Sequence, residues 1–426
     1  MIYLIILIAG FFILLALGTP IAFALSIPSA LVMMMSPDLS PIMLAQRIHS
    51  ACDSFSMMAM PFFMLAGSLM GTTGVTKNIV DFANSIVGHI RGGLAHTSSL
   101  AGMIMAGVSG SANADASALG ALLVPSMKEA GYEEGFSVSL VASCGLLGVI
   151  IPPSVVMVVY SGVSGVSIVK LFMAGIIPGI LCGVLYMVFS YFYSLKRGMP
   201  KGKFGGFRNI WNTFKKSVWA LLMPVIIIGS IVSGICTATE AGVIAVMYGI
   251  LYGILSRNLS MSSFIKCVKD AAFASAMSMC MIAFAVIFGY VLTVLNFPNI
   301  ITDFMMSHIS SPYGFALFVV AFLFVMGMFV DSTATMLMMI PIFLPIATAY
   351  GFDPLHFSMF AIIGLVSAGL TPPVGITLFV VCNTVKTNIN VASRSVWPFV
   401  FINYLVMILV ICIPQIATFI PTYFAA

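Results

Sequence analysis

The stretch "LLVPSMKEAGYEEG" at residues 122–135 has a counterpart 220 positions further along the chain, "FLPIATAYGFDP" at 343–354. A proline, a glycine and an acidic residue occupy matching positions in the two stretches. The same offset places "GVIIPPSV" at 148–155 on "AGLTPPVG" at 368–375, so a Pro-Pro pair occurs once in each half. The sequence therefore predicts two copies of one structural unit.

The composition indicates a membrane protein. Of 426 residues, 61% are hydrophobic and 7% are charged, and the mean hydropathy is +1.17. Apolar runs long enough to span a bilayer recur along the chain, which predicts an all-α polytopic fold. The run that opens at Met1 has no basic leader and no cleavage site, so we expect a mature helix and not a signal peptide. The eight cysteines form no CxxC pair or Cys/His cluster, which argues against a zinc site or a disulfide framework.

Each unit is predicted to contain a re-entrant helical hairpin followed by a helix broken at Pro-Pro. An odd number of crossings in the first unit would invert the second relative to the first. In the first half we expect helices near 2–17, 20–35 and 57–74, an amphipathic stretch at 77–92, a hairpin at 93–127, a broken helix at 136–166 and a last span at 170–195.

The predicted domains are a first repeat at 1–195, a basic linker at 196–217 and a second repeat at 218–426. The second repeat should hold a hairpin near 313–345 and a broken helix near 357–387. The stretch from 194 to 217 holds seven Lys or Arg residues and no acid, so the positive-inside rule places the linker in the cytoplasm. Both termini are then external, and Arg47 and Lys170 are the only basic residues outside.

Inverted repeats with interrupted helices are typical of secondary transporters, whose sites form near the membrane midplane where the breaks meet. A duplication without a transport role, as in some channels or assembly scaffolds, is the alternative. The breaks in this chain coincide with polar residues, which favours transport.

The tip of the first predicted hairpin lies in "AGVSGSANADASALG" at 106–120. A turn inside the membrane frees backbone carbonyls, which need a partner other than lipid. Carbonyl, hydroxyl and amide oxygens are the ligands that suit an alkali cation. Asp115 would either favour that cation through its charge or cap the following helix. The predicted ligands at this tip are Ser109, Gly110, Ser111 and Asn113.

The Pro-Pro pairs add a second source of oxygen atoms. Pro152 and Pro153 have no N–H, so carbonyls one turn earlier, near Gly148, lose their helical partners. Ser154 and Thr371 place hydroxyl groups beside the two breaks. A simple kink in a packed helix is the alternative, but two pairs at equal repeat positions favour a site.

The second tip is "FVDSTAT" at 329–335. A carboxylate within a membrane segment indicates a functional site by default, so Asp331 is predicted either to face a site shared with Thr371 and Gly375 or to cap the second arm of its hairpin. Half-helix N-termini that face the tips would favour an anionic substrate.

With these residues in view, the sequence resembles the large membrane subunit of a tripartite ATP-independent periplasmic (TRAP) transporter. The resemblance extends over nearly the whole chain. It is carried by "MPFFMLAGSLM", "DFANSIVGHIRGGLAHTSSLAGMIMAGVSGSANADASALGALLVPSMKEAGY", "IIPPSVVMVVYSGVSGVSI", "LFMAGIIPG" and "LTPPVGITLFVV". The pair Asn113-Ala114 departs from the small apolar pair expected at this tip.

The resemblance implies Na⁺-driven uptake of an organic acid anion, such as a C4-dicarboxylate or sialic acid, by an elevator movement in a bacterial inner membrane. It also implies a small four-helix membrane subunit, expected as a separate chain, and a periplasmic substrate-binding protein. Lipid is the other expected partner, and no nucleic acid or cofactor besides Na⁺ is expected.

Carried onto this sequence, the resemblance implies two sodium sites and a substrate site. The first sodium site comprises Ser109, Gly110, Ser111, Asn113, Gly148, Ile151 and Pro153. The second comprises Asp331, Ser332, Thr333, Thr335, Gly369, Thr371 and Pro373. The predicted substrate-binding residues are Asn113, Ser154, Asp331, Thr371 and Gly375.

Two other functions compete with transport. A channel would use the oxygen-lined tips as a filter, but filters usually need several subunits or a continuous pore. An intramembrane serine protease is suggested by "GVSG" at 107–110 and 162–165. That chemistry needs a histidine base on a neighbouring helix, and His96 lies on the same predicted hairpin arm as Ser109. We therefore expect no enzymatic activity.

Overall fold

The computed structural model describes residues 2–37, 39–54, 57–199, 201–329, 332–372 and 375–424. Within these ranges the chain is helical, without strands. Asp331 and Pro373, two of the predicted site residues, lie outside the described residues.

The first half begins with short apolar helices and ends with a long one. Its elements are α1 (Ile2–Ala16), α2 (Ile21–Met35), α3 (Ile42–Cys52), α4 (Ala59–Thr72), α5 (Val75–Val87), α6 (Gly93–Ser109), α7 (Ala112–Glu129), α8 (Glu134–Ile150), α9 (Val155–Ser164) and α10 (Ile168–Lys196).

The second half repeats this order after the linker. Its elements are α11 (Phe207–Val232), α12 (Ala238–Leu255), α13 (Met261–Val294), α14 (Phe297–His308), α15 (Pro312–Phe329), α16 (Ser332–Ala349), α17 (Pro354–Ala368), α18 (Ile376–Val385), α19 (Ile389–Ser395), α20 (Trp397–Cys412) and α21 (Gln415–Phe424).

Each half contains a helical hairpin followed by a broken helix. The hairpins are α6 with α7 and α15 with α16, and the broken helices are α8 with α9 and α17 with α18. The break between α8 and α9 bends the chain by 44° at the first Pro-Pro pair, where the two prolines remove amide donors from the helix. The fold is all-α and polytopic, with two inverted repeats that each hold these two elements.

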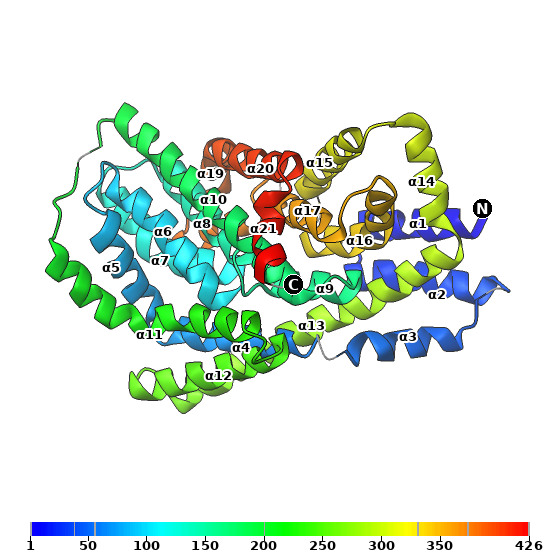
Figure 1. Ribbon diagram of the computed structural model, residues 1–426, viewed down its shortest axis with the longest axis horizontal. Coiled ribbons are helices and arrows are strands. Elements are labelled where there is room, and N and C mark those ends of the chain that lie inside the picture. The colour runs from blue at the N-terminus through cyan, green and yellow to red at the C-terminus, as the bar shows by residue number, and fades with distance from the viewer. Residues whose placement is uncertain are drawn as a thin grey trace.

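The hairpins and broken helices form a core that packs on a scaffold. We define the scaffold as α1–α4 with α11–α13, and the hairpin core as α6–α9 with α15–α18. Figure 1 shows α11, α4, α12, α13 and α3 along one side of the molecule and the hairpin core beyond them. In the scaffold α4 packs against α12 and α13. In the hairpin core α7 packs against α18, and α16 packs against α9, so the second hairpin arm of each repeat contacts the broken helix of the other.

Burial separates the two parts further. Every residue from Gly135 to Ile150 of α8, and every residue of α17 after Pro354, is buried. By contrast, α11 and α13 expose large apolar side chains such as Trp219, Val225 and Phe273, as expected for helices that face lipid. The first segments of the broken helices, α8 and α17, are therefore the centre of the protein.

Two features differ from the sequence-based expectation. Helix α3 was not predicted, because its mixed composition, with Gln46, Arg47 and His49, lacks an apolar run of spanning length. The predicted linker, 196–217, extends into α11, which already begins at Phe207. Its basic residues therefore lie partly on the first turns of a long helix.

By length and composition, four helices among the described residues are long and apolar enough to cross a membrane alone: α10, α11, α12 and α13. The number rises to seven if each bent pair of helices counts as one span. Helices α1, α2 and α4 are shorter, with 15, 15 and 14 residues, and the hairpins and broken helices interrupt the backbone between their two segments. Such irregular backbone at membrane depth is tolerated where protein covers it or where it lines a cavity.

Candidate functional site

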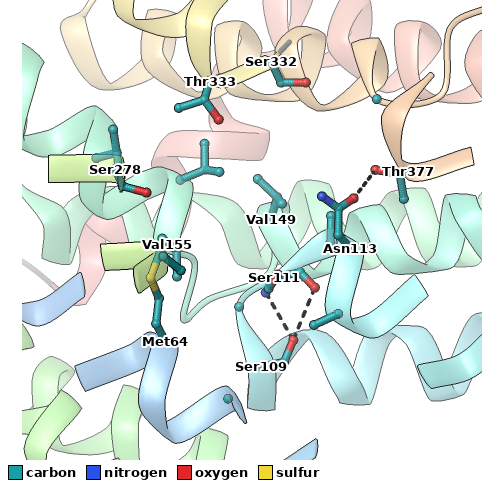
Figure 2. A pocket seen from close by; sticks show the side chains of 18 of the residues that line it. Met64, Ser109, Ser111, Asn113, Val149, Val155, Ser278, Ser332, Thr333 and Thr377 are labelled. Carbon is teal, nitrogen blue, oxygen red and sulfur yellow. Dashed lines mark hydrogen bonds between the residues drawn. The ribbon is translucent and has the colours of Figure 1, made fainter. Parts of the chain in front are cut away.

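A cavity of about 460 Å³ lies where the hairpin core meets the scaffold. It is bounded by the first tip, the start of α16, both broken helices and the scaffold helices α4 and α13. The polar residues that line it include three from the first tip and two from the second repeat's hairpin (Figure 2). They are Ser68, Ser109, Ser111, Asn113, Asp270, Ser278, Ser332, Thr333 and Thr377.

The first tip is a tight turn held against the first Pro-Pro break. Gly110 adopts φ +65° between α6 and α7, a left-handed conformation that glycine adopts without a steric penalty. The Ser111 N–H donates to Ser109 Oγ over 3.1 Å, and the Val155 N–H donates to Gly110 O over 3.3 Å. A Cβ atom at Gly110 would lie 2.6 Å from Pro153 O. The turn and the break are therefore in direct contact.

Asp115 lies in the first turn of α7 and is 1% exposed. Within the described residues neither of its carboxylate oxygens accepts a hydrogen bond, so the helix-capping role that the sequence left open has no supporting contact. A Cβ atom at Gly148 would lie 2.5 Å from Asp115 Oδ2 and 3.4 Å from the Ser111 carbonyl carbon. An unpaired charge buried in this way is strongly unfavourable unless a cation or a proton neutralises it.

Asn113 links the two repeats at the cavity wall. Thr377 Oγ1 of α18 donates to Asn113 Oδ1 over 3.0 Å, as Figure 2 shows. With its oxygen oriented by this bond, the Asn113 amide retains two N–H donors, and the side chain is exposed in the cavity. It can therefore donate to an oxygen atom of a bound molecule.

The second repeat contributes fewer of its predicted residues to the cavity. Ser332, Thr333 and Gly369 line it, whereas Thr335 and Thr371 are buried outside its lining. Thr371 Oγ1 donates to Ser367 O in the last turn of α17 over 2.9 Å. Asp331 and Pro373 lie outside the described residues.

Several predicted residues are buried near the cavity and do not line it. Gly148, Ile151, Pro153 and Gly375 are buried and are not among its lining residues. Ser154 is also buried, and its hydroxyl caps α9 by accepting from the Met157 N–H over 3.3 Å. The structure therefore gives Ser154 a contact typical of a helix cap and not of a substrate ligand.

Four polar lining residues were not predicted from the sequence: Ser68, Asp270, Ser278 and Thr377. The first three lie on scaffold helices outside any tip or break, so no local motif marks them. Asp270 alone carried a signal, as an acid within a long apolar helix. Thr377 follows the second Pro-Pro pair, but the matching position in the first repeat is the apolar residue Met157. The comparison of the repeats therefore gave no reason to select Thr377.

The charge of the lining is unusual for an anion site. Among the described residues that line the cavity, Asp270 carries the only full charge and none is a lysine or arginine. Hydroxyl and amide groups supply the other polar contacts.

The serines of the two "GVSG" segments make local contacts. Ser109 Oγ accepts from the Ser111 N–H, and Ser164 Oγ accepts from the Val166 N–H over 3.2 Å. Both are contacts of helix ends and turns.

Comparisons with known proteins agree over most of the chain. The sequence profile of the family described as "Tripartite ATP-independent periplasmic transporter, DctM component" matches residues 8–416. The sialic acid TRAP transporter large permease protein SiaM of Vibrio cholerae is 35% identical over 96% of each chain. The C4-dicarboxylate TRAP transporter large permease protein DctM of Pseudomonas aeruginosa is 35% identical over 92% of each chain.

A third relative has a longer chain. The isethionate TRAP transporter permease protein DctMQ of Oleidesulfovibrio alaskensis is 37% identical over 96% of this chain and 65% of its own length. Among solved structures, the Alcanivorax borkumensis YdaH transporter superposes with a TM-score of 0.64, at 14% identity and with 86% of each chain covered. The similarity to the YdaH transporter concerns the fold alone.

Proposed function

This chain belongs to the DctM component family of tripartite ATP-independent periplasmic transporters, and from that premise we propose that it imports an organic acid anion together with Na⁺ by an elevator movement. Family membership makes it the large permease subunit of a secondary transporter and a multi-pass protein of the bacterial inner membrane. The substrate class, the coupling ion and the movement are our proposal.

The observation that carries the proposal is the buried Asp115 carboxylate beside the first tip. It accepts no hydrogen bond within the described residues and lies next to Gly148 and the Ser111 backbone. A hard cation bound there would neutralise the charge and take oxygen ligands from the tip and the break. We assign the first sodium site to Ser109, Gly110, Ser111, Asn113, Gly148, Ile151 and Pro153, with Asp115 as its charged member.

The charge of the cavity favours the same conclusion. An anion in a cavity without lysine or arginine among its described lining residues needs another source of positive charge. Cations bound at the two tips would supply it, so cation and substrate binding would be mutually favourable. Substrate uptake driven by the sodium gradient follows from that coupling.

The second sodium site is proposed by the repeat relation, which aligns Asp331 with Ser111 and Thr335 with Asp115. Ser332 and Thr333 already line the cavity with the first tip. The assignment comprises Asp331, Ser332, Thr333, Thr335, Gly369, Thr371 and Pro373.

The substrate would lie between the two hairpins, where Asn113 presents its amide donors. Relatives named for sialic acid and for C4-dicarboxylates support a carboxylate-bearing substrate here. Such a carboxylate would accept from the Asn113 amide and from the serine and threonine hydroxyls of the cavity.

The elevator movement is supported by the cavity's position between two bodies. Its walls come from the hairpin core on one side and from α4 and α13 of the scaffold on the other. Sliding of the core along these helices would carry the cavity from one side of the membrane to the other. The basic linker faces the cytoplasm and both termini the periplasm in this proposal.

Two partners complete the proposed transporter. One is a small four-helix membrane subunit, and the other is a periplasmic protein that delivers the substrate. Exposed apolar side chains on α11 and α13 leave room for the small subunit and for lipid against the scaffold.

The test is uptake of labelled organic acids into proteoliposomes that hold this chain and its small subunit, with the binding protein outside. We expect uptake that needs both an inward Na⁺ gradient and the binding protein. Uptake that saturates and follows the gradient distinguishes a transporter from a channel. Uptake that is indifferent to Na⁺ would contradict the proposed coupling.

A further inference from the structure

A second cavity, of about 240 Å³, lies between α5 and the start of α11, two helices that pack against each other. Every residue that lines it is polar. They are Asn78, Asp81, Asn84, Asn209, Thr213 and Lys216. A polar cavity of this kind at a membrane protein's surface can receive a polar molecule from water or from the lipid interface.

The cavity combines one acid and one base that are available to a ligand. Asp81 and Lys216 are both exposed, and the ion pairs found in the described residues involve neither of them. The opposite charges within one small cavity suit a zwitterion better than a simple anion or cation.

One amide group of the cavity, that of Asn84, is oriented by a neighbouring contact. Asn84 Oδ1 accepts from Thr97 Oγ1 over 3.2 Å, which leaves the Asn84 N–H donors free. The two helices are joined by Ser217 Oγ, which donates to Asn78 O over 2.7 Å, and by the 2.9 Å contact of Ser85 Oγ with Thr213 Oγ1. The cavity therefore has fixed walls on both sides.

Exposed aromatic and apolar side chains occur along α11, and Trp219 follows the cavity residue Lys216 by about one helical turn. Phe207 is 82% exposed, Trp211 56% and Trp219 43%, and further along the helix Val225 is 64% exposed. The Lys215 ammonium lies 5.4 Å from the Trp211 ring centroid. Aromatic and basic side chains of this kind gather at the membrane interface, with apolar residues continuing toward the bilayer core.

We propose that this cavity binds the headgroup of a zwitterionic phospholipid with a primary ammonium group, of the phosphatidylethanolamine class. The ammonium would donate to the Asp81 carboxylate, and the phosphate would accept from Lys216 and the asparagine amides. The acyl chains would lie along the exposed apolar side chains of α11. The lipid would thereby join α5 to α11 on the side where the linker leaves the membrane.

The chemistry predicts an order among lipids. An anionic lipid such as phosphatidylglycerol has no ammonium for Asp81 and meets repulsion from it. Phosphatidylcholine keeps the charge but has no N–H to donate. We therefore expect ethanolamine lipids to bind more tightly than either.

Native mass spectrometry of the delipidated full chain tests this order, with ethanolamine, glycerol and choline lipids of identical acyl chains added in turn. We expect Asp81→Asn to weaken ethanolamine-lipid binding by roughly tenfold, the effect of losing one charge-assisted hydrogen bond, and not to weaken glycerol-lipid binding. Lys216→Gln should weaken both. Lys203→Gln and Asp303→Asn are matched controls, because both residues are exposed and lie outside the cavity.

Equal binding of the three lipids, or equal behaviour of Asp81→Asn and Asp303→Asn, would overturn the proposal. Soluble phosphoethanolamine provides the remaining arm. At a concentration equal to that at which the lipid saturates the cavity, phosphoethanolamine should not displace the bound lipid, because phosphoethanolamine lacks the acyl chains that contact α11. Displacement would show that the ligand is a free zwitterion and that the lipid assignment is wrong.

Discussion

The two hairpin tips carry the same chemistry in opposite order. At the 220-residue offset Ser111 aligns with Asp331, and Asp115 aligns with Thr335. Each tip thus has one acid and one hydroxyl at the two equivalent positions, but the acid stands later in the first tip than in the second. The duplication has kept the residue types and exchanged their places, so the two proposed sodium sites need not bind a cation equally.

The two interfaces between the repeats also differ, in the polar residues that they contain. Where α7 meets α18, Asn113 bonds to Thr377 and Ser117 Oγ lies 3.1 Å from Thr384 Oγ1. The repeat-related positions between α16 and α9 pair Thr333 with Met157 and Leu337 with Ser164. One interface thus has two polar cross-links, and the other has an apolar member at each of these positions.

The largest expected effect is that of Asp115→Asn, which removes the charge from the first tip. We expect Na⁺ to bind roughly 100-fold more weakly, because a lost charge-assisted contact is worth about 3 kcal/mol, and Na⁺-driven uptake to fall accordingly. Without Na⁺, the variant should unfold at the same temperature as the native protein or higher, because no unpaired charge remains buried. Uptake and thermal unfolding, each with and without Na⁺, check the prediction.

Asp303→Asn is the control, since Asp303 is exposed on α14 and should leave both measurements unchanged. Native Na⁺ dependence in the Asp115 variant would refute the assignment of the first tip. A lower unfolding temperature without Na⁺ would instead point to a structural role for the carboxylate.

The second prediction concerns the contact between the tip and the break. Gly110→Ala should destabilise the protein by about 3 kcal/mol, because a side chain at positive φ is strained and its Cβ would meet Pro153 O. Gly131→Ala is a matched control, with φ +85° and no atom within 4 Å of the new Cβ, and should cost only about 1 kcal/mol. Thermal unfolding of both variants in detergent measures the difference. Equal losses would mean that the tip is not held against the break.

The third prediction separates substrate binding from cation binding. Asn113→Leu removes the amide donors from the cavity, so we expect the substrate concentration for half-maximal uptake to rise about tenfold, as for one lost hydrogen bond to a charged group. Thr377→Val removes only the hydroxyl that orients the amide and should have a smaller effect in the same direction. Flux titrations at saturating Na⁺ check both. A changed maximal rate with unchanged substrate dependence would argue against contact with the substrate.

The sequence predicted the parts of this protein that depend on local chemistry. Pro-Pro pairs break helices wherever they occur, and the glycine-serine turn at 109–111 lies where α6 ends and α7 begins. Because the repeat brought these signals into register, both hairpins and both broken helices could be predicted with nearly the observed bounds.

The cavity's scaffold wall could not be predicted, because it depends on which helices pack together. Ser68 and Ser278 are ordinary small polar residues on helices that the sequence does not pair. Thr377 contacts Asn113 across 264 positions, a distance over which no local pattern operates. Ser154 remains a predicted substrate-binding residue, and the structure adds a local contact. Its hydroxyl satisfies the N-terminus of its own helix, a use that competes with ligand binding wherever serine begins a helix.

The smallest expected effect tests the interface comparison itself. Ser117→Ala and Thr384→Val each remove one side of a single neutral contact at the α7–α18 interface, so each should lower stability by about 1 kcal/mol or less. In the double variant the loss should be smaller than the sum of the two single losses, since both changes remove the same contact. Thermal unfolding measures all three. Additive losses would show that the two hydroxyls act independently, and the α7–α18 interface would then retain only the Asn113 bond to distinguish it from its repeat-related counterpart.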